Sequence, residues 1–173
     1  MRPPWSCWTT PTRSRRPLER AGTALAAPLL AVLSLAACSP TAPPGVDRDQ
    51  LDAAVSKAVG DPNSCVLIAK AVSGRTLYRY NTATACAREF PACDGPGTRK
   101  LSSLLEATAK DRQARQLSCN TQADASRGVG WAAGPIAGTD LVYAAMMEGE
   151  RAFPGRMMAD RLEGAFRRAK VSK

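Results

Sequence analysis

The side chains that perform most enzyme chemistry are unevenly represented in this chain of 173 residues. Histidine is absent, which removes the usual proton shuttle at neutral pH and the commonest metal ligand. A Ser-His-Asp triad and a histidine-based zinc site are therefore excluded. Cysteine is the chemically informative residue that remains, with six copies in the chain.

Four cysteines lie in the part of the chain that has the pattern of a folded domain: Cys65, Cys86, Cys93 and Cys119. An even number in an exported domain of this size predicts two disulfide bonds. The alternative is a four-thiolate zinc site, but such sites normally use Cys-x-x-Cys pairs, and the sequence has none. Since a small loop separates Cys86 from Cys93, we expect these two to be bonded and, by elimination, Cys65 to be bonded to Cys119.

A fifth cysteine, Cys38, ends a segment with the features of a secretory leader. Residues 1–20 are basic and contain prolines, and residues 21–37 are apolar and uncharged, which is the order found in a signal peptide. The closing Leu35-Ala36-Ala37-Cys38 resembles a bacterial lipobox. The alternative is a retained transmembrane anchor, for which the apolar run is short.

The lipobox resemblance implies a cellular location as well as a lipid modification. Residues 1–37 would be a lipoprotein-type signal peptide, and Cys38 would become the lipid-bearing N-terminus. We therefore expect a lipid-anchored protein of the cell envelope, at the outer membrane or the periplasmic face if the cell is Gram-negative.

The rest of the chain divides into a linker and one folded domain. Residues 38–46 contain three prolines and no hydrophobic periodicity, which predicts a Pro-rich tether, and residues 47–173 suffice for a single α+β domain. The formal charge of +9 falls to +5 without the leader, which has five arginines and one glutamate. No basic run is interleaved with aromatic residues, so nucleic-acid binding is not expected. The expected partners are the membrane, through Cys38, and an envelope protein or peptidoglycan, with no metal or cofactor.

Hydrophobic periodicity predicts a helix near each end of the domain. Asp47 is placed to cap a helix over residues 47–59, with Gly60 in a left-handed C-terminal cap. The second terminal helix is expected over residues 156–170. A further helix, beginning at Thr98 or Ser102, fades into a polar segment over residues 110–115.

Two β-hairpins are predicted between the terminal helices. The first has strands over 65–72 and 76–81, and the second has strands over 128–134 and 141–147, although the last range also permits a helix. The first strand is apolar on both faces and belongs in the interior of the sheet. Residues 82–97 show no regular pattern. The expected fold class is α+β, with an antiparallel sheet of two hairpins, about four to five strands, covered by N- and C-terminal helices.

The first hairpin, with its Ser73-Gly74 turn and returning Leu77-Tyr78-Arg79-Tyr80-Asn81, resembles the opening hairpin of serine β-lactamases and penicillin-binding transpeptidases. Residues 128–147, followed by the helix over 156–170, are similar to the last strands and helix of that fold. The resemblance implies a reduced β-lactamase-like domain. No catalytic residue carries over, because the chain has no Ser-x-x-Lys and no Lys-Thr-Gly; the nearest substitute is Ser126-Arg127-Gly128.

Three groups of residues remain as candidates for chemistry or binding. A divergent serine hydrolase acting on peptidoglycan or β-lactams would have to use Ser102, Ser103 or Ser126. The acidic pairs Asp160 with Glu163 and Glu148 with Glu150 are interpreted as surface ion pairs. An aromatic ligand platform is weighed against a core role for Trp131, Tyr78, Tyr80 and Tyr143, and the core role is favoured. The sequence therefore predicts no catalytic residue and a binding or scaffolding role.

Overall fold

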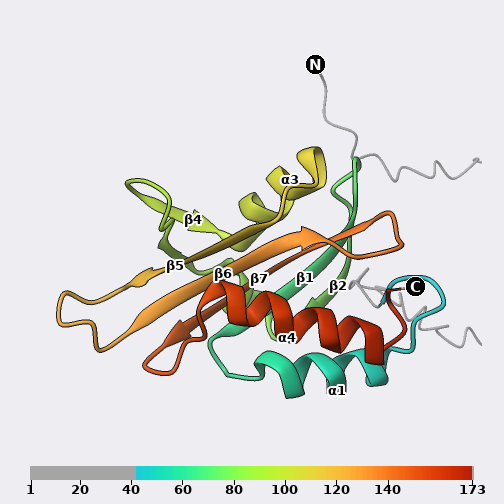
Figure 1. The fold of residues 1–173 in the computed structure, drawn as a ribbon, viewed down its shortest axis with the longest axis horizontal. Coiled ribbons are helices and arrows are strands. Elements are labelled where there is room, and N and C mark those ends of the chain that lie inside the picture. The colour runs from blue at the N-terminus through green and yellow to red at the C-terminus, as the bar shows by residue number, and fades with distance from the viewer. Residues whose placement is uncertain (1–41, 173) are drawn as a thin grey trace, which may run out of the picture. The chain divides into compact units, whose positions relative to one another are not determined.

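The computed structural model describes residues 42–172, whose centre is a five-stranded antiparallel sheet (Figure 1). Across the sheet the strands follow the order β2-β1-β7-β6-β5. Their bounds are β1 (Ser64–Lys70), β2 (Thr76–Tyr80), β5 (Arg115–Asn120), β6 (Gly128–Pro135) and β7 (Leu141–Gly149). The expected α+β class, with an antiparallel sheet built on two hairpins, is confirmed.

Strand β1 lies inside the sheet, between β2 and β7, as its apolar sequence predicts. Successive side chains of a strand point to opposite faces of the sheet. Accordingly, Val66 and Ile68 belong to one hydrophobic core, and Cys65 and Leu67 belong to the other. Because β7 pairs with the full length of β1, the two hairpins form one continuous sheet with a core on each face.

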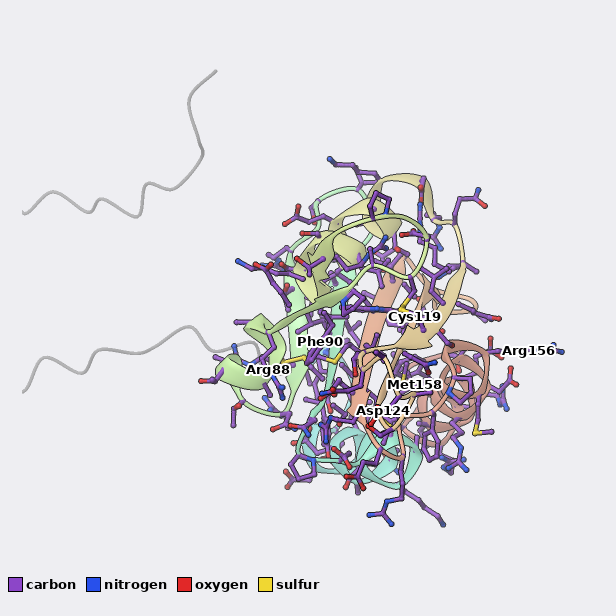
Figure 2. All side chains as sticks on the ribbon, turned by 90° about the vertical axis from the view of Figure 1, so that its left-hand side faces the viewer. Arg88, Phe90, Cys119, Asp124, Arg156 and Met158 are labelled. Carbon is purple, nitrogen blue, oxygen red and sulfur yellow. A yellow bond between two sulfur atoms is a disulfide. The ribbon has the colours of Figure 1, made fainter. Side chains whose placement is uncertain are left out.

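Both terminal helices, α1 (Arg48–Val59) and α4 (Gly155–Arg168), lie on the same face of the sheet and pack against each other (Figure 1). Helix α4 is amphipathic: Met158 is buried, whereas Arg156 points away from the protein (Figure 2). The predicted cover of the sheet by terminal helices is therefore present, on one face. No helix described within residues 42–172 is long and apolar enough to cross a membrane.

Helix α1 begins as predicted, because the Asp47 side chain accepts a hydrogen bond from the backbone N–H of Gln50 at 2.7 Å. Its end differs from the prediction. Gly60 has φ −68° and ψ 107°, which is extended backbone and not a left-handed cap. A β-carbon on Gly60 would lie 2.3 Å from the carbonyl oxygen of Ser56, so lack of space, not a positive φ, requires glycine here.

Helix α3 (Leu101–Asp111) covers the opposite face of the sheet, where it packs on β1, β6 and β7. It buries Leu101, Leu104 and Leu105 against Trp131 in the second core. It begins between the two predicted starting points, and Arg112, with φ 56°, ends it in a left-handed conformation. The indole N–H of Trp131 donates to the carbonyl oxygen of Pro91 at 2.9 Å and so fastens the segment before α3 to the sheet.

The middle of the chain is more regular than predicted. Residues 82–100 form helix α2 (Ala83–Ala87) and a small separate sheet of β3 (Glu89–Pro91) and β4 (Thr98–Lys100). Strand β5 was not predicted: it begins at Arg115, at the end of the polar segment over residues 110–115 that was expected to follow the helix. Strand β5 can be polar because it lies at the edge of the sheet, where only alternate residues are partly buried.

The two expected disulfides are present, but the predicted pairing is wrong. Cys65 is bonded to Cys86, with a Cα–Cα distance of 5.2 Å, and Cys93 is bonded to Cys119, with a Cα–Cα distance of 5.4 Å. Helix α2 turns the chain back over β1 and sets Cys86 beside Cys65. Cys119 lies in the unpredicted strand β5, which brings it to Cys93. The prediction of a small closed loop failed because both bonds depend on these two unpredicted elements.

Candidate functional site

The serines considered as nucleophiles lie apart on the surface. Ser102 and Ser103 are exposed in the first turn of α3, and Ser126 is exposed in the turn between β5 and β6. Lys100, which lies close to the first two in sequence, forms an ion pair with Glu89 at 3.3 Å. Within the described residues, no hydrogen bond joins a serine hydroxyl to a lysine amine. These serines therefore lack an adjacent lysine amine to activate them as nucleophiles. Ser126 lies beside Asp124 instead, and its hydrogen bonds lower the pKa of that carboxyl, which makes it a weaker base.

The triplet Ser118-Cys119-Asn120 in β5 has the Ser-x-Asn spacing that is one of the motifs of the β-lactamase family. The structure gives its residues other roles. The Ser118 hydroxyl accepts a hydrogen bond at 2.9 Å from the backbone N–H of Gly155, the first residue of α4. Cys119 is in a disulfide bond. Both residues therefore attach the edge strand to neighbouring elements.

The aromatic residues considered as a ligand platform are divided between the two cores. Trp131 is fully buried on the α3 face. Tyr78 and Tyr143 are buried on the opposite face, and Tyr80 packs partly buried against the same core. The Tyr78 hydroxyl donates to Asp52 at 2.7 Å, and its burial, together with this hydrogen bond, raises the pKa of Tyr78. The core interpretation is therefore confirmed, and the four residues do not share a surface.

Three of the four carboxylates considered as pairs are exposed, as expected: Glu150, Asp160 and Glu163. Glu148 is only 4% exposed, so its interpretation as a surface residue is wrong. Strand β7 is buried from Leu141 onward and carries Glu148 into the interior near its end. The physical reason is that a central strand, covered on both faces, buries whatever residue it presents, and Glu148 must then be paired.

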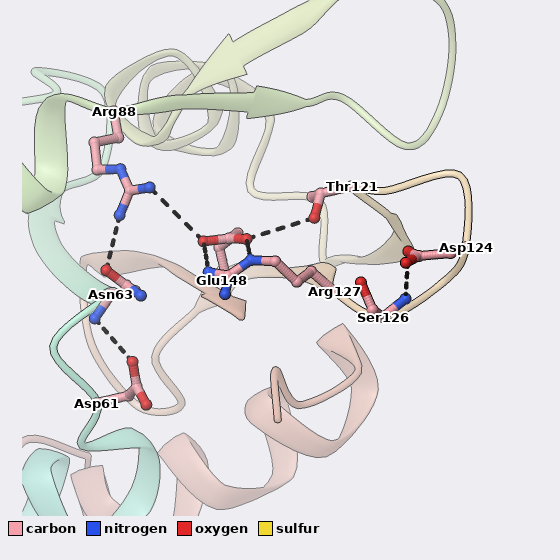
Figure 3. Close-up of polar contacts among 8 residues, drawn as sticks. All are labelled: Asp61, Asn63, Arg88, Thr121, Asp124, Ser126, Arg127 and Glu148. Carbon is pink, nitrogen blue, oxygen red and sulfur yellow. Dashed lines mark hydrogen bonds and ion pairs between the residues drawn. The ribbon is translucent and has the colours of Figure 1, made fainter. Parts of the chain in front are cut away.

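Arg127 is the principal partner of Glu148 (Figure 3). The Nε and Nη2 groups of Arg127 donate to the two carboxylate oxygens, each at 2.9 Å. This two-pronged geometry matches the planar guanidinium to the planar carboxylate. The register of the sheet creates it, because β6 starts at Gly128 opposite Gly149, at the end of β7.

Two further side chains hold the same carboxylate. The Thr121 hydroxyl donates to Glu148 at 3.4 Å, and Nη2 of Arg88 lies 3.7 Å from Glu148 Oε2. Arg88 also donates from Nη1 to the side chain of Asn63 at 2.8 Å and lies over the ring of Phe90, 4.7 Å from its centroid. One buried carboxylate thus connects four segments that are remote in sequence (Figure 3).

The electrostatics of this Glu148 cluster favour the ionised carboxylate. The hydrogen bond from Arg127 lowers the pKa of Glu148 most, burial opposes it, and the positive charges of Arg127 and Arg88 lower it further. An ionised carboxylate whose oxygens are both occupied has no proton to donate and no free lone pair aimed at a substrate. The cluster is therefore built to hold the end of the sheet together.

No spacing rule reveals the Glu148 cluster in the sequence, because Asn63, Arg88 and the turn that holds Thr121 and Arg127 are far apart along the chain. One signal does point to it. Glu148 is the first charged residue after the uncharged run of residues 141–147. A charge that continues such a buried run needs a partner, although the sequence does not say which one.

No protein-family model, no curated protein and no solved structure matches the chain. Between residues 42 and 172, no group of three or more cysteine, aspartate or glutamate side chains is arranged to hold a metal ion. The four cysteines of this part are oxidised in pairs, which removes the thiolates that the alternative zinc site would need.

Proposed function

We propose that the chain is a lipid-anchored protein of the cell envelope, with a non-catalytic binding or scaffolding domain of degenerate β-lactamase-like fold. The two disulfides carry this proposal. Disulfides form and persist in the oxidising compartments outside the cytoplasm and are rare within it. The leader that ends in Leu35-Ala36-Ala37-Cys38 supplies a route to such a compartment.

The burial of the cysteines supports a structural role for these bonds. Cys65 is fully buried in the core that faces α3, and Cys86 is nearly so. A disulfide enclosed in a packed core is protected from exchange with solvent thiols, unlike the accessible bonds of redox enzymes. The bond between Cys65 and Cys86 therefore belongs to a protein that folds where oxidation is available.

The non-catalytic part of the proposal is supported by the roles of the residues nearest to the family motifs. Ser126 lies in an exposed turn, where its backbone N–H donates to Asp124 at 3.0 Å. Its neighbour Arg127 is engaged with Glu148 and does not point toward a nucleophile. Arg127, which is the nearest substitute for the lysine of the Lys-Thr-Gly motif, therefore helps to hold the sheet together.

The arrangement of the elements supports the β-lactamase-like part of the proposal. The opening hairpin β1–β2 and the closing hairpin β6–β7 meet through β1 and β7, and the closing helix α4 packs beside α1. The segment between the hairpins contributes α2, α3, a two-stranded sheet and the edge strand β5. A compact domain of this kind offers surfaces for binding without the helical domain that the resemblance would otherwise imply.

The lipid anchor is tested by metabolic labelling with an alkyne analogue of palmitate, in a bacterial host that exports the full chain. We expect the wild-type protein to carry the label, to fractionate with membranes and to begin at an acylated Cys38. Cys38→Ser should lose the label. The matched control, Cys7→Ser, should keep it, because Cys7 lies in the segment that is removed.

Mass spectrometry of the same samples decides the proposal. A protein that retains Met1, with an unmodified sulfur at Cys38, would contradict the lipid anchor. Free thiols at Cys65, Cys86, Cys93 and Cys119 in cells would contradict the exported location, since these residues would then not have met an oxidising compartment.

A further inference from the structure

One end of the sheet presents an unusual exposed side chain. Val72 lies in the turn between β1 and β2 and is 92% exposed. Its φ of 68° is in the left-handed region, which β-branched residues rarely occupy. The turn is nevertheless anchored, because the backbone N–H of Val72 donates to the carbonyl oxygen of Ala109, in the last turn of α3, at 2.9 Å. The anchored turn thus holds the apolar side chain of Val72 in solvent.

Cationic side chains surround this end of the sheet. Lys70 and Arg75 flank the turn that carries Val72, and they are joined by a backbone hydrogen bond from Lys70 to Arg75 at 3.1 Å. Arg112 donates to the carbonyl oxygen of Thr139, in the neighbouring turn between β6 and β7. Lys170 follows the end of α4. These four cations and Val72 are referred to below as the basic end.

The chain that leads to Cys38 enters the folded part at the same place. Lys70 and Lys170 line a hollow of about 580 Å³ together with residues 43–46 and residues 138–141. Pro43 is buried there, so this stretch is attached to the domain. Figure 1 shows the start of the described chain, the turn between β6 and β7 and the end of α4 along one side of the domain.

The acidic groups near the basic end are already engaged. Asp140 pairs with Lys70 at 3.6 Å, and Asp47 caps α1. Asp111 pairs with Arg115, which lowers the pKa of Asp111 to about 2. The cations Arg75, Arg112 and Lys170 are all exposed. The end therefore has a positive surface with one apolar tip.

We propose that the basic end docks on the anionic surface of the bilayer that holds the lipid anchor. This inference rests on the proposed lipidation of Cys38. Cys38 lies only four positions before Ala42, and four extended residues span at most about 14 Å. A lipid on Cys38 therefore keeps this end, and not the opposite one, next to the headgroups.

The chemistry of the surface fits phospholipid headgroups. Lysine and arginine beside a membrane are attracted to anionic phosphates within about a Debye length, roughly 8 Å at physiological salt. An apolar side chain raised among cations can enter the interfacial layer, as in amphipathic surfaces that lie on membranes. The lipid fixes the distance from the bilayer, and the basic end fixes the orientation of the domain.

The test uses the lipidated protein, reconstituted in vesicles of phosphatidylcholine alone or of phosphatidylcholine with phosphatidylglycerol. A water-soluble amine reagent modifies accessible lysines, and mass spectrometry measures the modification of each one. We expect the modification of Lys70 and Lys170 to fall about threefold or more on the anionic vesicles. Lys57, in the last turn of α1, and Lys100, before α3, serve as internal controls and should not change.

Two variants separate the apolar tip from a general surface effect. Val72→Asp should restore the modification of Lys70 and Lys170 on anionic vesicles. It should not disturb folding, because residue 72 is exposed and aspartate tolerates a positive φ better than valine does. The matched control is Met157→Asp, which changes another exposed apolar residue, at the start of α4. It should leave the protection intact.

The outcomes distinguish this inference from the proposed function. Equal modification of Lys70 and Lys170 on the two kinds of vesicle, with the acyl mass present on the protein, would overturn the docking proposal and leave the lipid anchor standing. Absence of the acyl mass would overturn the lipid anchor, and the docking proposal with it. Protection that Met157→Asp removes as fully as Val72→Asp would show that the basic end is not the docking surface.

Discussion

At the scale of single residues, Glu148 is a buried charged side chain whose stability depends on its partners. A buried carboxylate is costly unless it is paired and hydrogen-bonded. Arg127 and Thr121 supply that pairing from the turn between β5 and β6, and Arg88 supplies it from the end of α2, so the pairing depends on both segments being in place. The side chain therefore reports on the packing of one whole end of the sheet.

Replacement of Glu148 by glutamine tests this assignment through pH. The lowered pKa means that Glu148 stabilises the fold above the ordinary glutamate pKa, near 4.3, and that this stabilisation is lost as the pH falls through the lower value of the folded protein. At pH 7, E148Q should lower the free energy of unfolding by about 2 kcal/mol. Urea unfolding from pH 7 to 3 should show a weaker pH dependence for E148Q than for the wild type.

Glu150 provides the control for this experiment, because it is exposed two residues further along. E150Q should leave both the free energy of unfolding at pH 7 and its pH dependence nearly unchanged. If E148Q behaved like E150Q, Glu148 would not be a buried ionised group.

At the scale of elements, the start of α4 fits against the sheet with no spare room. A β-carbon on Gly155 would lie 2.1 Å from the carbonyl oxygen of Trp131, and one on Gly130 would lie 2.0 Å from that of Phe153. Since these neighbours are backbone atoms, they cannot move aside as a flexible side chain would. The glycines set how closely the helix approaches β6.

Alanine substitutions in α4 test this close approach. Gly155→Ala should lower the free energy of unfolding by about 2 kcal/mol, as expected of overpacking. Gly164→Ala is the matched control in the same helix, where the nearest group is the flexible end of Arg168 at 3.3 Å. Helix propensity should make that variant neutral or more stable by up to about 1 kcal/mol. Thermal or urea unfolding of the two variants measures the difference, and equal destabilisation would contradict the assignment.

The disulfides provide a second test at this scale. Peptide mapping without reduction should recover the pairs Cys65–Cys86 and Cys93–Cys119. Removal of the second bond by C93S with C119S frees the edge strand β5 and should lower the free energy of unfolding by about 3.5 kcal/mol, the entropic value for a closed loop of this length. Recovery of a peptide that joins Cys86 to Cys93 would show that the pairing described here is wrong.

At the scale of the whole molecule, the domain is a sheet covered on both faces, with its candidate chemistry distributed between packing and surface roles. The serines are solvated, the aromatic residues fill the cores, and the best-partnered carboxylate joins loops. In residues 42–172, the structure does not bring these residues together in one site. This distribution is what the proposed non-catalytic binding role leads us to expect.

A fluorescent penicillin tests this view of the intact protein. We expect no covalent labelling, because none of the serine hydroxyls considered as nucleophiles is hydrogen-bonded to a lysine amine, and the carboxyl beside Ser126 has a lowered pKa. Labelling would be read after gel electrophoresis, with an active penicillin-binding protein as the positive control. Labelling that Ser102→Ala, Ser103→Ala or Ser126→Ala abolishes would contradict the non-catalytic proposal and establish the serine hydrolase alternative.

The sequence by itself determined the terminal helices, the two hairpins and the number of disulfides, because each depends on local patterning. The apolar face of residues 47–59 and the alternation in residues 76–81 are readable without a partner. The same is true of the interior position of β1, since a strand that is apolar on both faces has to be covered on both.

Only the tertiary structure decided the pairing of the cysteines, the edge strand β5 and the partners of Glu148. Strand β5 is polar on its own and is a strand because β6 lies beside it. Cys93 and Cys119 meet through that strand, and Arg88 and Arg127 reach Glu148 from loops far apart in the chain. These contacts join residues whose separation in the sequence carries no periodic signal, so they exist only once the sheet has brought them together.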